Sequence, residues 1–234
     1  MKRVMFLTAL VICLASCIGE KFATGDVESR TFTISGDIDA IAASASFDVT
    51  VDPTLSQGEV VVSTHTDIFD KVDISVDGTT LNIDLNSWIL RARTLAVRVP
   101  VYEYNTIAMS GGVDFSWLGC NVPSLTIAVS GGADVEIEAE CQDITLATSG
   151  GADVELWGSS HSFVVAASGG ADVDAIRLIA DRVEVSASGG ADVEVYATES
   201  LKIEASGGAD VSYAGNPTNT DINASGGADV SREN

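Results

Sequence analysis

Hydrophobic and polar residues alternate through the second half of the chain, and the alternation is organised around a recurring phrase of six residues. The phrase SGGADV occurs six times, and a variant, SGGVDF, begins at Ser110. The six identical copies begin at Ser130, Ser149, Ser168, Ser188, Ser206 and Ser225. Successive copies lie 18 to 20 residues apart. A period of this length is typical of repeat architectures.

Each unit reads as two strands with one buried face. Counted from the serine as position zero, the odd positions −5, −3, +5 and +7 are mostly apolar, while the even positions zero, +2, +4 and +6 hold Ser, Gly, Asp and usually an acid. Position −3, for example, holds Ile107, Ile127, Leu146, Val165, Val185, Ile203 and Ile222. Period two is the signature of a half-buried strand. The parity continues through Gly-Gly, which predicts a bend there, because glycine tolerates positive φ.

A unit of about 19 residues is too short to close a core alone or to hold a strand–helix crossover. Stacking the units as coils of a parallel β-helix solves this, because each coil pairs with its neighbours and the odd positions fill a common interior. The alternatives are a propeller, whose blades need about 40 residues, and an antiparallel meander, which lacks hairpin signals between units. We therefore predict an all-β fold, a β-solenoid of seven coils over residues 106–234.

Residues 30–105 also read as strands and are expected to start the solenoid and cap its first coil, since an exposed parallel edge invites aggregation. The best hairpin signal is Asp77-Gly78, between Val72–Val76 and Leu81–Leu85. Ser35-Gly36-Asp37-Ile38 is a candidate degenerate copy of the repeat phrase.

The first residues predict export. Lys2 and Arg3 precede an apolar run that is too short for a permanent membrane span. The sequence Leu14-Ala15-Ser16-Cys17 resembles a bacterial lipobox, which implies a signal peptide over 1–16, a lipidated Cys17 and a tether over 17–29. The alternative is an ordinary secretory signal cut nearby. In the first case the protein is anchored to a bacterial membrane, on the periplasmic or surface side of the outer membrane.

The chain is strongly acidic, with a net charge of −22 that becomes −24 without Lys2 and Arg3. Such a chain is expected to repel nucleic acid and anionic lipid headgroups. The expected partners are the membrane, through the anchor, and an unidentified envelope, carbohydrate or protein ligand.

Cys120 and Cys141 remain after the signal is removed. They occupy positions +10 and +11 of adjacent units, so they are expected to lie nearly one above the other, within disulfide range. An oxidising compartment permits this bond. The alternative is two stacked free thiols.

One aspartate per unit forms a predicted ladder of carboxylates. Its members are Asp114, Asp134, Asp153, Asp172, Asp192, Asp210 and Asp229. Neighbours about 5 Å apart repel. Either Ca²⁺ between the coils or backbone N–H groups at the bend would offset this repulsion. We favour the structural turn role over a weak calcium ladder, and we expect no other cofactor.

The sequence lacks the motifs of common enzymes, including GxSxG, HExxH and the P-loop. His65 and His161 have no partner pattern, and the basic residues of the repeats do not lie beside the aspartates in sequence. We predict no enzymatic activity and no catalytic residues. By parity Trp117 belongs to the core, whereas Trp157 faces solvent and could stack on sugar. The alternative function is therefore a polysaccharide-binding or polysaccharide-cleaving β-helix that uses the acidic face.

The order of these features resembles one family. A lipoprotein signal is followed by the phrases SFDVTV and VRVPVYEYNTIAMSGGVD, and then by the SGGADV coils. This order is similar to that of the head GIN domain family of putative auto-transporter adhesins, over about residues 30–234. The resemblance implies a right-handed, single-stranded parallel β-helix, similar to pectin-lyase-like folds but without their catalytic residues. It implies an adhesin or a structural module of the cell envelope, and it brings no site residues with it.

Overall fold

The structure is a computed structural model that describes residues 23, 25–86 and 94–233. The predicted signal peptide, Cys17 and most of the tether lie outside these residues. The regular structure within them is β-strand: β1 (Val27–Thr33), β2 (Ala40–Ala43), β3 (Asp48–Asp52), β4 (Glu59–His65), β5 (Val72–Asp77), β6 (Thr80–Leu85), β7 (Leu95–Pro100), β8 (Thr106–Gly111), β9 (Asp114–Cys120), β10 (Ser124–Gly131), β11 (Asp134–Gly150), β12 (Asp153–Gly169), β13 (Asp172–Ala187), β14 (Asp192–Ala205), β15 (Asp210–Gly215), β16 (Asn219–Ala224) and β17 (Asp229–Arg232).

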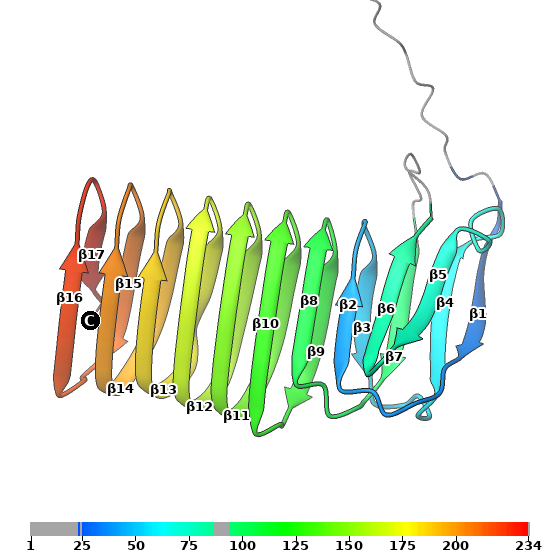
Figure 1. Ribbon diagram of the computed structural model, residues 1–234, viewed down its shortest axis with the longest axis horizontal. Helices are drawn as coiled ribbons and strands as arrows, with labels where there is room; N and C mark the ends of the chain where they lie inside the picture. Colours follow the sequence, from blue (N-terminus) through cyan, green and yellow to red (C-terminus); the bar gives the residue numbers. More distant parts are fainter. Residues whose placement is uncertain (1–22, 24, 87–93, 234) are drawn as a thin grey trace, which may run out of the picture.

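The repeat units stack as coils of a flattened parallel solenoid with two layers (Figure 1). The front layer contains β8, β10, the second halves of β11 to β14, and β16. The back layer contains β9, the first halves of β11 to β14, β15 and β17. Equivalent positions lie opposite one another, so Leu146 pairs with Ile127 on one side and Val165 on the other. The predicted parallel solenoid of about 19 residues per coil is confirmed.

The core lies between the two layers and follows the predicted parity. Ile127, Leu146 and Val165 from the front strands, and Val135 and Val154 from the back strands, are all buried. Burying a side chain of this size contributes about 1.5–3 kcal/mol. Repeating the same position in every coil therefore gives a continuous interior that no single coil could form.

The Gly-Gly bends stack along one edge, at the top of Figure 1. The first glycine has positive φ, as at Gly131 (87°) and Gly150 (91°). A Cβ on Gly150 would lie 2.6 Å from the Gly131 carbonyl oxygen. That carbonyl accepts the N–H of Gly151 at 2.8 Å. Glycine is thus required both by backbone conformation and by the closeness of the next coil.

The N-terminal part is folded into the same stack, but its order in space differs from its order in sequence. Strand β2 pairs in parallel with β6 and β8, and β3 pairs in parallel with β7 and β9. The β2–β3 coil therefore lies between the repeats and the β6–β7 segment. Beyond it β4 pairs antiparallel with β7 and β1, while β5 and β6 form the predicted antiparallel hairpin around Gly78.

The degenerate copy of the repeat phrase that was expected at Ser35–Ile38 lies at other residues. Ser35–Ile38 precede β2, whereas Ser44–Val49 lie in register with the first repeat, as shown by Asp48 opposite Asp114. Ala45 occupies the place of the first glycine and has φ of 74°. The Gly112 N–H donates to the Ala45 carbonyl at 2.6 Å, as at the other bends. The copy is obscured in sequence because Ala45 and Ser46 replace both glycines.

The last described coil, β16 and β17, is much more exposed than the others. Ile222 is 38% exposed, whereas Ile203 at the same position one coil earlier is fully buried. Arg232 turns back and donates to the Gly215 carbonyl at 2.7 Å.

Candidate functional site

A shallow trough of about 730 Å³ runs along the front layer, below the Gly-Gly bends. Two columns of small side chains line it, one residue of each per coil. Ala42, Ala108, Ala128, Ala147 and Ala166 form the first column, and Ser44, Ser110, Ser130, Ser149, Ser168 and Ser188 form the second. We call this surface the serine trough. Its regularity follows from the register, which repeats positions −2 and zero in every coil.

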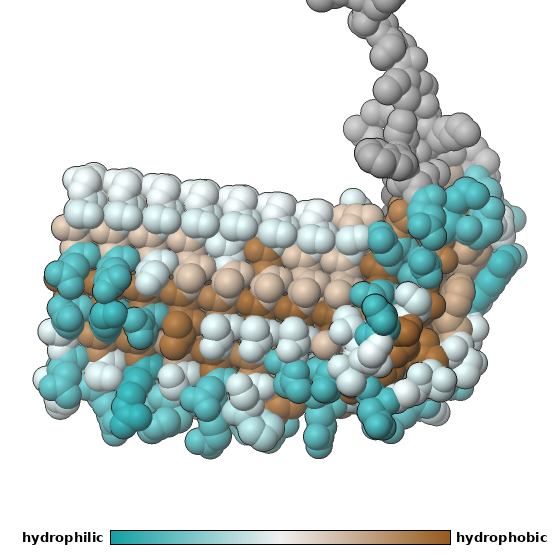
Figure 2. Space-filling view, in the orientation of Figure 1, coloured by the Kyte–Doolittle hydropathy of each residue, from teal (hydrophilic) through white to brown (hydrophobic). Residues whose placement is uncertain are grey.

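The serine trough is nearly uncharged on a very acidic protein. Among its described lining residues Asp84 is the one ionisable side chain, and Ser44 Oγ donates to its Oδ1 at 2.6 Å. Figure 2 shows this face as a white to brown band, with hydrophilic side chains gathered along the lower edge and towards both ends. At the C-terminal end the neighbouring hollow of about 670 Å³ includes Glu204, so the neutral stretch ends there.

The trough serines leave most of their hydrogen-bonding capacity unused. Ser110 Oγ donates to the Ala43 carbonyl at a long 3.5 Å. Within the described part of the chain, the hydroxyls of Ser130, Ser149, Ser168 and Ser188 make no hydrogen bond to protein. The trough therefore combines a methyl surface with a row of available hydroxyls spaced about 4.8 Å apart. Sequence reasoning missed this site, although the small residues at position −2 were a readable signal.

The predicted aspartate ladder lies on the back layer and is one member longer than expected, because Asp48 lies opposite Asp114. Burial, and then the neighbouring carboxylates, raise the pKa of Asp114, Asp134 and Asp172. A second acidic column at position +6 runs beside the ladder, and hollows of about 330 and 410 Å³ lie between the columns. The two acidic columns thus lie on the layer opposite the serine trough.

Apart from a hydrogen bond between the Asp48 and Asp114 carboxyl groups, which contributes to the raised pKa of Asp114, the ladder carboxylates accept no hydrogen bond from described residues. At each bend it is the aspartate N–H that bonds, as from Asp134 to the Val113 carbonyl at 2.9 Å. The favoured turn role is therefore not visible as side-chain hydrogen bonds. Among the described residues no cluster of three or more His, Cys, Asp or Glu is arranged to hold a metal ion. The calcium ladder remains a prediction.

The two tryptophans within the described residues, Trp117 and Trp157, lie in different environments, as expected from parity. Trp117 is buried and packs edge-to-face on Tyr104, with ring centroids 5.7 Å apart. Trp157 is partly exposed, and the Arg177 guanidinium lies 5.3 Å from its ring centroid while also pairing with Glu155. Arg177 does not line the acidic hollows. Its partner Glu155 lines the smaller of these hollows.

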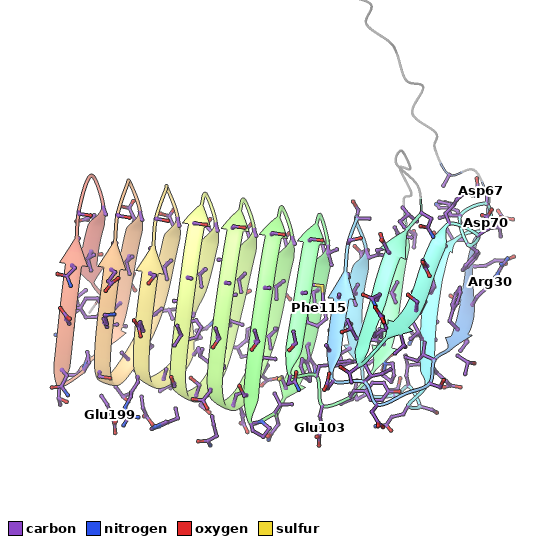
Figure 3. All side chains as sticks on the ribbon, in the orientation of Figure 1. Arg30, Asp67, Asp70, Glu103, Phe115 and Glu199 are labelled. Atoms are coloured by element: carbon purple, nitrogen blue, oxygen red, sulfur yellow. The ribbon has the colours of Figure 1, made fainter. Side chains whose placement is uncertain are left out.

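Both described histidines are engaged. His161 Nδ1 lies 3.0 Å from Asp181 Oδ2, and Arg182 donates to its Nε2 at 2.9 Å. His65 is buried, and its Nδ1 lies 2.7 Å from the Gly25 carbonyl oxygen. Figure 3 shows Glu199, which pairs with Arg182, at the edge opposite the Gly-Gly bends together with Glu103. The His161 group is thus an exposed polar network that bridges neighbouring coils.

The cysteines are close, but not as their sequence positions suggest. Cys120 lies opposite Ala139 rather than Cys141, because the strand register shifts between Ile137 and Ala139. Both cysteines are buried and are free thiols in this structure. The two thiols are nevertheless close enough that each shifts the pKa of the other.

No helix in the described ranges is long and apolar enough to span a membrane.

Comparisons with known proteins agree with this architecture. A family model described as putative auto-transporter adhesin, head GIN domain, matches residues 37–217. A putative adhesin from Bacteroides fragilis has a similar structure, with a TM-score of 0.83 at 20% identity, covering 91% of this chain and 100% of that one. A putative adhesin from Parabacteroides merdae gives 0.73 at 14% identity, covering 92% and 99%.

A third solved structure, a putative lipid binding protein from Parabacteroides distasonis, gives a TM-score of 0.71 at 18% identity, covering 92% of this chain and 99% of that one. At these identities the likeness shows the fold alone. No curated protein matches the sequence.

Proposed function

Since the chain belongs to the head GIN domain family of putative auto-transporter adhesins, we propose that it is an exported, lipid-anchored and non-enzymatic adhesin that makes contact through the serine trough. The observation that carries this proposal is the nearly uncharged trough on a chain with a net charge of −22. The ligand class that it suits is a neutral, extended polymer.

The charge distribution supports a neutral ligand. Acidic columns on the back layer repel anionic polymers, and they would attract cationic ones to the face opposite the trough. A neutral polymer is not attracted to the acidic face by charge. On the trough it could lie against the alanine methyl groups while its polar groups bond the free serine hydroxyls. A linear polysaccharide has both the apolar surface and the polar groups that these contacts need.

The position of the anchor supports an adhesive role. Cys17 precedes Val27, the first residue of β1, by ten positions, a reach of about 35 Å at most. Strand β1 lies at the capped end of the solenoid, and the repeats extend away from it (Figure 1). A lipid on Cys17 would therefore hold the capped end near the membrane, and the part of the trough that lies on the repeats would project away from it.

The arrangement of titratable groups supports a non-enzymatic role. A hydrolase needs an acid and a base at one concave site. Among the described residues that line the trough, Asp84 alone is ionisable, and its Oδ1 accepts a hydrogen bond from Ser44. On the acidic side the basic group Arg177 is paired with Glu155 of the +6 column.

A charge introduced into the trough provides the test. The variant Ala128→Asp/Ala147→Asp adds two carboxylates to the neutral column. The control, Ser116→Asp/Ser212→Asp, adds the same charge at position +6 of the back layer, where neighbouring coils already carry acids. Binding would be measured on an array of neutral and acidic glycans and by adhesion of cells that display the full chain.

We expect the trough variant to lose binding to neutral glycans at least tenfold, and the control to bind like the wild type. Equal binding by all three proteins would overturn the trough as the contact surface. Loss in the control alone would favour the alternative, a polysaccharide-binding protein that uses its acidic face.

A further inference from the structure

Cys120 and Cys141 form a buried pair at the edge opposite the Gly-Gly bends. Cys120 ends β9, and Cys141 lies near the middle of β11, where the chain passes from the back layer to the front layer. The two side chains are 1% and 7% exposed. They belong to consecutive coils, 21 residues apart in sequence.

The backbone around both cysteines is held by hydrogen bonds between the two coils. Cys120 is paired with Ala139, and the Pro123 carbonyl accepts the N–H groups of Gln142 and Asp143 at 3.0 and 3.1 Å. Segment 120–123 therefore runs alongside segment 139–143, with Cys141 between the two attachment points. Both side chains belong to the same buried hydrophobic core.

The thiols already interact. Interaction with the Cys141 thiol, together with burial, raises the pKa of the Cys120 thiol, and interaction with Cys120 lowers the pKa of the Cys141 thiol to about 7. Cys141 is thus the sulfur that more readily becomes the thiolate, which is the nucleophile in thiol–disulfide exchange.

We propose that Cys120 and Cys141 form an intramolecular disulfide that joins the first two coils of the repeat region. The oxidant is a disulfide, either of an oxidoreductase or of glutathione. The Cys141 thiolate attacks one sulfur of that disulfide and releases a thiolate from it. The Cys120 thiolate then attacks the Cys141 sulfur and releases the second. The oxidant gains two electrons and two protons and becomes two thiols.

Burial sets the time at which the bond forms. A thiol buried in a folded core is inert to bulky oxidants. The exchange therefore takes place while the two coils are still stacking, and the finished core then protects the bond from reductants. The two cysteines lie at the end of the repeats that meets the N-terminal part. In a solenoid the stability of each coil depends on its contacts with the coils next to it. A covalent bond between the first two repeat coils would keep these two coils from separating.

Peptide mapping of the wild-type protein provides the first test. The full chain would be isolated from the envelope of its host, and in a second arm unfolded and refolded in a mixture of reduced and oxidised glutathione. After alkylation under denaturing conditions, cleavage at the glutamates between the cysteines, such as Glu136 and Glu140, separates them. We expect the two peptides to remain linked and to carry no alkyl group on Cys120 or Cys141. Alkylation of both cysteines in both arms would overturn the proposal, as would a linkage between two chains.

Thermal unfolding gives a second measurement. For a closed loop of this length, reduction is expected to lower the midpoint by roughly 6–12 °C. The variant Cys120→Ser/Cys141→Ser should unfold at the midpoint of the reduced wild type and should not respond to reductant. A wild-type midpoint that is unchanged by reduction, confirmed by alkylation, would show that no such bond stabilises the chain. Neither measurement depends on ligand binding, so failure of the trough proposal would leave this one standing.

Discussion

The carboxylate of Asp134 stands beside that of Asp114, because the two residues lie opposite each other in the parallel strands β11 and β9. Burial raises the pKa of Asp134, and Asp114 and Asp153 on either side raise it further. Folding therefore brings together negative charges that lie far apart in the unfolded chain.

Removing one charge from the ladder should stabilise the protein. Two unit charges 4.8 Å apart repel by about 0.9 kcal/mol at the dielectric constant of water, less with salt. We expect Asp134→Asn to raise the thermal midpoint by roughly 1–4 °C at low ionic strength and by less in 1 M NaCl. The control is Asp143→Asn on the same strand, where the flanking residues are Ser124 and Ser162. An equal rise in both variants would contradict repulsion along the ladder.

The ladder also predicts how stability depends on pH. A raised pKa in the folded state means that Asp114, Asp134 and Asp172 bind protons more readily folded than unfolded. Their contribution to stability therefore decreases as pH rises from the unfolded value, about 3.9, through the folded value. Acidification from pH 7 towards about 4 should raise the midpoint.

Below that range other aspartates reverse the trend. Hydrogen bonds from Thr54 lower the pKa of Asp52, and a hydrogen bond from His161 lowers that of Asp181. The stabilisation that Asp52 and Asp181 provide is fully present above the pKa of an unfolded aspartate. It is lost as the pH falls through the lower pKa that each has in the folded state. We thus expect a maximum of stability near pH 4–5, measured by thermal unfolding from pH 3 to 8. A midpoint that falls steadily from pH 7 downward would be the contrary result.

Calcium should stabilise the ladder no more than another divalent cation does. Ca²⁺ takes six to eight oxygen ligands, and the ladder supplies one carboxylate per coil. We expect equal, small rises of the midpoint with CaCl₂ and MgCl₂ at matched ionic strength, relative to EDTA. A rise of more than about 5 °C that is specific to calcium would make the ladder a metal site, and Asp153→Asn should then abolish that rise.

The sequence predicted most of the core, because strand parity depends only on local alternation. Ile127 and Leu146 were assigned to the interior from that alternation and are buried there. The β2–β3 coil was missed, since Ala45 and Ser46 hide the repeat phrase and the coil is inserted out of chain order. The position of Cys120 was missed because a shift in register between Ile137 and Ala139 places it opposite Ala139, one residue away from the position that simple counting gives.

The serine trough was missed for a different reason. Parity places Ala128 and Ser130 on the outer surface, but it does not say that the same small residues will form a continuous neutral surface. That property appears only when several coils are aligned, and it depends on which columns carry charge. A site of this kind can be recognised from the repeat once the register is known.

Lipidation of Cys17 is a prediction that lies outside the described residues. If the lipobox is used, the full chain should sediment with membranes and partition into the detergent phase of Triton X-114. Cys17→Ala should leave the signal peptide uncleaved by the lipoprotein pathway, and the protein should carry no lipid. The control Cys13→Ala changes a cysteine of the signal peptide and should keep the lipid. A wild-type protein whose N-terminal peptide carries no lipid by mass spectrometry would favour an ordinary secretory signal.

The two glycines of a single bend should respond differently to the same substitution. Gly150 has φ of 91°, and an added Cβ would lie 2.6 Å from the Gly131 carbonyl oxygen. Gly151 has no positive φ, and an added Cβ would meet nothing within 4 Å. Gly150→Ala must therefore strain the backbone and separate two stacked coils, which we expect to cost about 2–4 kcal/mol. Gly151→Ala should change stability by less than about 1 kcal/mol in either direction. Chemical denaturation of both variants measures the difference, and equal losses would mean that the stacking of the bends does not determine which glycine is required.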